Sequence, residues 1–193
     1  MGATGAAARA AEQVLDLALS RPPTLRAGRL VLVDGPSGAG KTTLAAAVAA
    51  AAGARAVASR LVHLDAMYDG WEGLPGIGSS LAALLAPLAE GRPGAYRRYD
   101  WVAGRYAGTG TVEPVDLLVV EGVGAAAPGV AHLGTVLVWV DAPRDLRRRR
   151  GVERDGPAYE AVWERWEASE VETFARDRGR ERADLVVDGA ASR

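Results

Sequence analysis

Residues 35–43 constrain the fold more than any other part of the chain, because they fit the pattern G-x-x-x-x-G-K-[ST]. The hydrophobic residues 30–33 before them indicate a short buried strand, and the alanine-rich residues 43–49 after them indicate a helix. A glycine-rich turn between a strand and a helix is the setting of a phosphate-binding P-loop. The residues of this predicted loop are Gly35, Pro36, Ser37, Gly38, Ala39, Gly40, Lys41, Thr42 and Thr43.

The residue types in this loop suit the binding of a nucleotide. Glycine lets backbone N–H groups converge on a phosphate, and the N-terminus of the following helix adds a partial positive charge. We expect Lys41 to neutralise the β and γ phosphates of ATP and the Thr42 hydroxyl to reach Mg²⁺. Lys41 is also the only lysine in a chain whose other basic residues are all arginine. The alternative, an ordinary turn with a surface lysine, is disfavoured by the complete pattern and both its flanks.

Length and composition indicate a single domain, 1–193. A chain of 193 residues is long enough to bury a core of its own. The apolar share of 49% and the charged share of 24% are typical of a soluble globular protein. The net charge of −1 gives no indication of a nucleic-acid partner or of an anionic membrane surface.

The residue types and segments that are missing exclude several classes of function. With no cysteine, the chain has no disulfide framework and no thiolate chemistry, which suits the reducing cytoplasm where we expect the protein. No apolar run is long enough to span a bilayer, and Glu12 and Asp16 interrupt the stretch that a secretory signal would need. With no asparagine, the chain lacks the catalytic-loop Asn of protein kinases and the Asn-Lys-x-Asp motif of GTPases.

Strand-like segments alternate with helical ones along the chain. Strands are indicated at residues 30–33, 57–64, 115–120, 135–140 and 183–187, and helices at 6–19, 43–53, 80–90 and 159–178. This alternation predicts an α/β fold of the P-loop NTPase type, with a doubly wound, mostly parallel five-stranded sheet and helices on both faces. Residues 1–27 are expected to form a helical extension ahead of the first strand. In the last helix Trp163 and Trp166 recur at the spacing of a buried face, so we expect them to pack in the core.

Acidic residues follow two of the predicted strands. Asp65 comes after strand 57–64, and Glu121 follows strand 115–120. Because ligands bind beyond the carboxyl ends of parallel strands, both acids should lie at the same sheet edge as the P-loop. Asp65 is then a candidate general base, and Glu121 resembles a Walker B carboxylate that orients Mg²⁺. The alternatives are a turn or capping aspartate and a solvent-exposed glutamate at the end of a strand.

Residues 70–110 form an irregular, glycine-rich insertion that we expect to build an acceptor site. Within it, the segment 96–106 mixes tyrosine and tryptophan with arginine. Such a segment could form a pocket in which a ring stacks while a guanidinium fixes a hydroxyl or an anion. A small β-ribbon with solvated arginines is the alternative.

Residues 142–157 are predicted to form an arginine-rich lid. They begin near Pro143, which suits the first turn of a helix, and they contain Arg147, Arg150 and Arg154 among other arginines. A lid that closes over phosphates would stabilise developing negative charge and exclude water. The alternatives are a basic solvated helix and a nucleic-acid patch, and the near-zero net charge argues against the second.

From residue 30 to residue 188 the chain resembles the uridine kinase family of small-molecule P-loop kinases. The resemblance lies in the Gly-Pro-Ser-Gly-Ala-Gly-Lys-Thr-Thr loop, in Asp65-Ala66-Met67-Tyr68 where the family has Asp-x-Phe-Tyr, and in Tyr99-Asp100-Trp101 where it has Tyr-Asp-Phe. It continues in Glu121-Gly122 and in the lid segment that ends at Arg154-Asp155. In the family a His and an Arg follow the Tyr-Asp-Phe, whereas here only Arg105 is kept.

The resemblance implies a specific set of roles. Asp65 would accept the proton of an acceptor hydroxyl, with Tyr68, Tyr99, Arg98 and Arg105 binding the acceptor. The lid residues Arg147, Arg150 and Arg154 would hold the phosphates of ATP. The reaction implied is in-line transfer of the γ-phosphoryl group of Mg-ATP to a hydroxyl of a nucleoside or a similar small metabolite. A nucleoside monophosphate kinase and a non-catalytic ATP-binding regulatory protein stay open as alternatives, as does a homo-oligomeric state.

Overall fold

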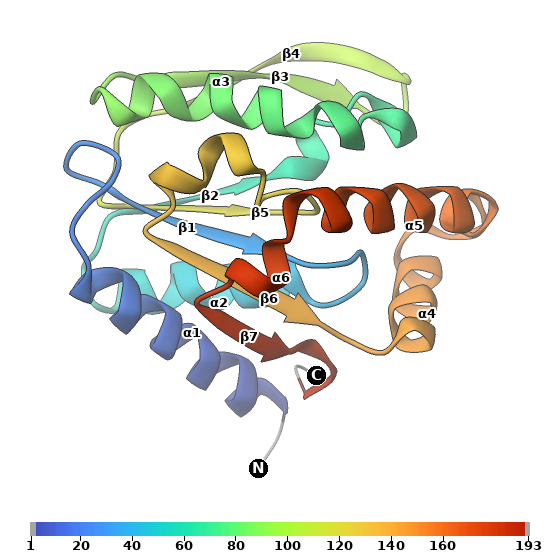
Figure 1. Cartoon of the computed structure of the whole chain (residues 1–193), viewed down its shortest axis with the longest axis horizontal. Helices are drawn as coiled ribbons and strands as arrows, with labels where there is room; N and C mark the ends of the chain where they lie inside the picture. Colours follow the sequence, from blue (N-terminus) through green and yellow to red (C-terminus); the bar gives the residue numbers. More distant parts are fainter. Residues whose placement is uncertain (1–2, 192–193) are drawn as a thin grey trace.

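Five strands form the central sheet of the protein, whose computed structural model describes residues 3–191 (Figure 1). They are β1 (Arg29–Asp34), β2 (Ser59–His63), β5 (Leu117–Glu121), β6 (Val136–Asp141) and β7 (Leu185–Asp188), in the spatial order β2-β5-β1-β6-β7. Every neighbouring pair is parallel, which confirms the predicted fold class. Residues 1, 2, 192 and 193 lie outside the described residues. The ends of the predicted domain, 1–193, and the start of its predicted helical extension, 1–27, therefore lie outside them as well.

The strands carry apolar residues on both faces, and each face is covered by helices. In β1, Leu30 and Leu32 join one hydrophobic cluster while Val31 and Val33 join the other, as expected from side chains that alternate along a strand. The helices α1 (Ala3–Ser20) and α2 (Lys41–Ala54) supply apolar side chains to the cluster around Val31. The opposite face packs against α3 (Ile77–Ala89) and α5 (Pro157–Asp177), so the prediction of helices on both faces is confirmed (Figure 1).

Part of the predicted insertion forms a separate antiparallel ribbon. Its strands are β3 (Gly94–Asp100) and β4 (Arg105–Val112), and residues 101–104 make the turn between them. The ribbon lies beside α3, away from the main sheet (Figure 1). The β-ribbon interpretation of segment 96–106 is therefore correct for its backbone.

Two further helices, α4 (Arg144–Asp155) and α6 (Gly179–Arg182), complete the set of α-helices in residues 3–191. The predicted lid segment forms α4, and Gly156, with φ 71° and ψ −158°, separates it from α5. Short 3₁₀ turns occur at Leu64–Ala66, Gly70–Glu72, Leu74–Gly76, Pro128–Leu133 and Gly189–Ala191. None of the helices described has both the length and the apolar character needed to cross a membrane.

Candidate active site

A cavity of about 720 Å³ opens at the carboxyl edge of the sheet. It lies where β1 gives way to α2, beside the ends of β2 and β5, as expected for a ligand site in an open parallel sheet. From the predicted P-loop it is lined by Ser37, Gly38, Gly40, Lys41, Thr42 and Thr43. Asp65 and Glu121 line it as well, so the structure brings both strand-end acids to the loop.

Glycine is required in the P-loop for backbone geometry and for packing. Gly35 and Gly38 have φ values of 137° and 76°, which favour glycine. A Cβ atom at Gly35 would overlap the carbonyl oxygen of Val140, and one at Gly38 would overlap the backbone of Arg147 in α4. The loop is thus held between β6 and α4, and α2 begins directly after it at Lys41, so that the first turn of α2 lines the cavity. Free N–H groups at a helix N-terminus suit a nucleotide phosphate.

Lys41 is buried, with 7% of its surface exposed. Its Nζ donates hydrogen bonds to the carbonyl oxygens of Gly35 at 2.8 Å and Pro36 at 3.0 Å. The ammonium group therefore lies within the loop whose N–H groups would hold a phosphate. A single compact cation with several donors is well matched to phosphate oxygens at this place.

Thr42 and Glu121 are joined in a short polar chain. The Thr42 hydroxyl donates to Glu121 Oε1 at 3.1 Å, and His63 Nδ1 lies 2.6 Å from the same oxygen. Glu121 is 3% exposed although its residue type is usually solvated. A hydroxyl and a carboxylate are oxygen ligands of the kind that Mg²⁺ prefers, with water and phosphate supplying the rest. The donor set therefore fits Mg²⁺ bound together with a nucleotide.

Asp65 lies in the 3₁₀ turn that follows β2, and its side chain faces the cavity. Asp65 is exposed to the cavity, yet desolvation by the protein around it raises the pKa of this carboxyl above its usual value, and the negative Glu121 raises it further. Lys41, Arg154 and His63 act in the opposite direction. An acid with a raised pKa beside a phosphate site has the features of a proton acceptor.

Sequence reasoning missed Asp34, the last residue of β1. Its side chain is 1% exposed and accepts three backbone N–H groups, from Gly35 at 2.6 Å, Gly124 at 3.0 Å and Ala126 at 2.7 Å. Asp34 therefore ties the first residue of the P-loop to the loop after β5. Burial raises its pKa to about 6 in spite of these hydrogen bonds.

The raised pKa of Asp34 predicts a pH-dependent stability. Because the folded protein binds this proton more tightly than the unfolded chain, the contribution of Asp34 is largest below pH 4 and falls as the pH rises through about 6. Between about pH 4.5 and 7 we expect the wild type to lose about 2 kcal/mol of unfolding free energy relative to Asp34→Asn. Urea unfolding of both proteins at the two pH values measures this difference, and a difference that does not change with pH would contradict it.

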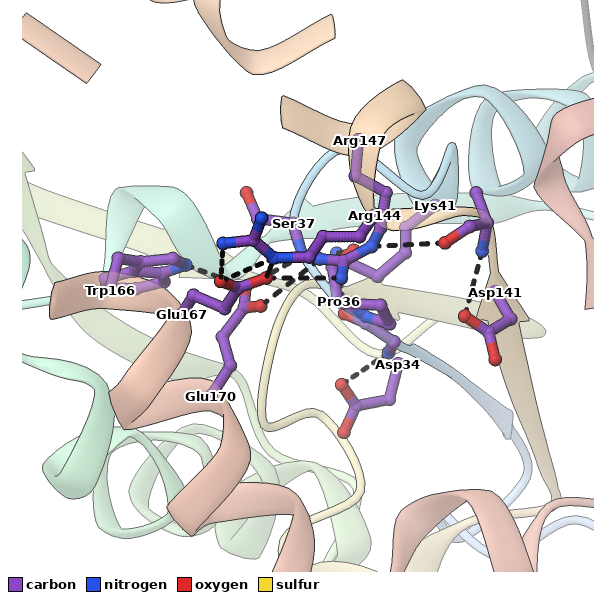
Figure 2. Close-up of polar contacts among 12 residues, drawn as sticks. Asp34, Pro36, Ser37, Lys41, Asp141, Arg144, Arg147, Trp166, Glu167 and Glu170 are labelled. Carbon is purple, nitrogen blue, oxygen red and sulfur yellow. Dashed lines mark hydrogen bonds and ion pairs between the residues drawn. The ribbon is translucent and has the colours of Figure 1, made fainter. Parts of the chain in front are cut away.

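A second buried carboxylate, Glu170 of α5, holds the P-loop from the other side (Figure 2). Its Oε1 accepts the backbone N–H of Ser37 at 2.7 Å and the indole N–H of Trp166 at 2.8 Å. Arg147 of α4 lies 3.8 Å from Oε2 and also 3.5 Å from Glu167. Burial raises the pKa of Glu170, whereas Lys41 and these N–H donors lower it. This network connects α4, α5 and the P-loop.

The structure separates the three arginines that were predicted to hold phosphates. Arg150 and Arg154 line the cavity, and Arg150 donates to the carbonyl oxygens of Gly38 at 3.3 Å and Gly189 at 3.1 Å. Arg154 is paired with Asp155 at 2.7 Å. Arg147 turns inward to α5 and is absent from the cavity wall. The spacing of an arginine-rich helix shows that the side chains differ in direction, but only packing against α5 decides which of them turns inward.

Of the predicted acceptor residues, only Tyr68 lines the cavity, and its hydroxyl donates to the carbonyl oxygen of Val123 at 2.9 Å. Tyr99 lies behind Trp101, with ring centroids 5.2 Å apart. Arg98 and Arg105 are exposed on the β3–β4 ribbon and do not reach the cavity wall. The structure therefore does not bring these two arginines to the site.

Tryptophan side chains, and not Arg98 or Arg105, line the cavity. Trp71, Trp101 and Trp166 all line the cavity. Trp166 is also 4% exposed and belongs to the hydrophobic core cluster, so the expectation that it packs in the core is confirmed. Helical spacing could not distinguish a core from a cavity wall, because both are apolar. Trp101 is the residue that the sequence could have identified as part of the cavity wall. It is a large aromatic residue directly after Tyr99-Asp100, at the turn of the ribbon.

Comparisons with known proteins agree with this geometry. The model of the Phosphoribulokinase / Uridine kinase family matches residues 79–191, more than half of the chain. The solved structure described as "Structure of a Possible Uridine Kinase from Bacillus stearothermophilus" superposes with a TM-score of 0.66 at 19% identity, covering 93% of this chain and 98% of that one. A "putative fructose transport system kinase from Silicibacter sp. TM1040" gives a TM-score of 0.62 at 20% identity, covering 94% and 97%.

At these identities the two structures establish the shared fold and not a substrate. A search of curated proteins gives no match. The family model supplies the assignment, since it covers most of the chain that follows the P-loop helix. The chain belongs to the phosphoribulokinase/uridine kinase family and is a P-loop kinase of that type.

Proposed function

We propose that this protein transfers the γ-phosphoryl group of ATP, in the presence of Mg²⁺, to a hydroxyl group of a small metabolite. The observation that carries the proposal is one cavity that joins the P-loop, the Thr42 and Glu121 pair and Asp65. Such a transfer needs hydrogen-bond donors that hold the phosphates, ligands for magnesium and a proton acceptor.

Each group has a place in the proposed reaction. The first-turn N–H groups of α2 and the Lys41 ammonium hold the phosphates, with Arg150 and Arg154 on the α4 side of the cavity. Thr42 and Glu121 would hold Mg²⁺, which would supply charge neutralisation at the phosphate oxygens. Asp65 takes the proton of the acceptor hydroxyl. The acceptor oxygen forms a bond to phosphorus, the bond between phosphorus and the bridging oxygen breaks, and ADP leaves with those electrons.

An acceptor screen tests this proposal. Purified protein is incubated with Mg-ATP and single candidates from four groups: nucleosides, nucleoside monophosphates, sugars and simple alcohols. ADP release and the mass of the phosphorylated product are measured for each candidate. A phosphorylated alcohol supports the proposal, whereas a preference for a monophosphate would indicate a nucleoside monophosphate kinase. ATP binding without ADP release for every acceptor would indicate a non-catalytic nucleotide-binding protein.

A further inference from the structure

The P-loop is attached to α4 and α5 at two consecutive residues, Ser37 and Gly38. The backbone N–H of Ser37 donates to Glu170 Oε1 at 2.7 Å, and its hydroxyl accepts a hydrogen bond from the Tyr159 hydroxyl at 3.0 Å. Gly38 packs on the backbone of Arg147, so closely that an added Cβ atom would lie 2.4 Å from the Arg147 carbonyl oxygen. A loop that is already held in one shape binds its ligand without a further ordering cost.

Glu170 is the only charged group in these attachments to Ser37, and it is deeply buried. Its side chain is 2% exposed. Oε1 accepts the N–H groups of Ser37 and Trp166, whereas Oε2 has no hydrogen-bond partner among the described residues. A buried carboxylate without a counter-charge is costly, so the bond to the P-loop depends on a cation beside Glu170.

Arg147 provides this cation (Figure 2). Its side chain is 11% exposed, and Nη1 lies 3.8 Å from Glu170 Oε2. Nε donates to the carbonyl oxygen of Ala142 at 3.2 Å, Nη2 lies 3.5 Å from Glu167 Oε1, and Cζ lies 5.7 Å from the centre of the Trp163 ring. These contacts direct the guanidinium to α5 and away from the cavity.

Resting on the nucleotide site of the proposed function, we infer that Glu170 is a positioning residue for the P-loop, and that Arg147 is its counter-charge and not a phosphate ligand. Arg147 would then act on ATP only through Glu170 and Ser37. The counter-charge matters for ATP as well, because Lys41 lowers the pKa of Glu170, which places this carboxylate within electrostatic reach of the phosphate site. Without Arg147, Glu170 would repel the phosphates or leave Ser37.

The two residues can be separated by a double-mutant cycle in the full chain, with the Kd for Mg-ATP measured by calorimetry without acceptor. Arg147→Met removes the charge and leaves Glu170 buried without its counter-charge, so we expect the Kd to rise by about tenfold. Glu170→Gln keeps an oxygen that accepts the Ser37 N–H, so its Kd should stay within about threefold of the wild type. The double variant should also stay within about threefold, because the charge that Arg147 neutralises is gone.

Two further variants distinguish positioning from a general loss of fold. Glu170→Met removes the hydrogen-bond acceptor as well as the charge, and should raise the Kd by about tenfold where Glu170→Gln does not. Arg148→Met is the matched control, since Arg148 is an exposed arginine on the same helix and does not line the cavity. Its Kd should change by less than about twofold. A partly unfolded variant would show fewer binding sites at an unchanged Kd, and urea unfolding measures that fraction.

Some results would overturn the inference and leave the proposed function intact. A double variant that binds Mg-ATP as weakly as Arg147→Met would make Arg147 a phosphate ligand. Glu170→Gln that binds about tenfold more tightly than the wild type would make Glu170 a competitor of the phosphates.

If the wild type does not bind Mg-ATP, the proposed function fails, and hydrogen exchange at the Ser37 amide, followed by NMR, decides the inference. Exchange that is faster in Arg147→Met and returns to the wild-type rate in the double variant supports it. The same exchange rate in all three proteins overturns it.

Discussion

The Asp65→Asn variant is expected to transfer phosphoryl groups ~10²–10⁴-fold more slowly than the wild type while it binds ATP with unchanged affinity. Asparagine has nearly the same shape as aspartate and still accepts hydrogen bonds, but it cannot take up the proton of the acceptor hydroxyl. The loss should therefore appear in kcat, because the interaction removed is one that forms in the transition state.

Two measurements separate this effect from damage to the fold. The kcat is determined with the best acceptor of the screen, and the ATP affinity is determined by calorimetry without acceptor. The matched control is Asp69→Asn, because Asp69 is exposed four residues further on and does not line the cavity. A kcat for Asp65→Asn within a few-fold of that of the control would remove Asp65 from the proposed reaction.

The pH dependence gives an independent check on Asp65. Only the deprotonated carboxylate accepts a proton, so kcat/KM should fall as the pH is lowered through the pKa of Asp65. Since desolvation by the surrounding protein and the charge of Glu121 raise that pKa, the acid limb should lie above the ordinary aspartate value of 3.8. The Asp65→Asn variant should lack this limb. An unchanged acid limb in the variant would assign it to another group.

The P-loop and the sheet could be predicted from the sequence because their signals are local. Residues 35–43 carry their whole pattern in one stretch. The strands β1, β5 and β6 are buried on both faces, so each is a short, continuous apolar run in the sequence. In a parallel sheet the residues that follow each strand then lie at one edge. Asp65 and Glu121 were found by this reasoning without any knowledge of their contacts.

The missed residues depend on contacts between distant parts of the chain. Ser37 and Glu170 are 133 positions apart, and Trp101 and the Asp65 carbonyl are 36 apart. Neither contact leaves a periodic pattern in the sequence. The arginines show the same limit, because α4 packs Arg147 against α5 and leaves Arg150 and Arg154 to the cavity. Local spacing identified the arginine-rich helix, but tertiary packing decided which side chains face the site.

Replacing Lys41 is the second change with a large expected effect. Lys41→Met keeps the length of the side chain and removes its charge, so we expect weaker ATP binding and a kcat/KM for phosphoryl transfer lower by ~10²–10³-fold. Lys41→Arg should not restore the rate, because a planar guanidinium directs its N–H groups differently from the compact ammonium that bonds to the Gly35 and Pro36 carbonyl oxygens. Calorimetry with ATP and the acceptor assay measure both effects. Wild-type rates in Lys41→Met would contradict the proposed role.

Because Lys41 is the only lysine in the sequence, its role can also be tested in the unaltered protein. An amine-selective acylating reagent can modify only Lys41 and the α-amino group, and the two products are distinguished by peptide mass. If the Lys41 ammonium neutralises the nucleotide phosphates, Mg-ATP should slow acylation at Lys41 and leave the α-amino group unaffected. Activity should then fall in proportion to acylation at Lys41. Loss of activity while Lys41 stays unmodified, or acylation that Mg-ATP does not slow, would show that this amine does not contact the nucleotide.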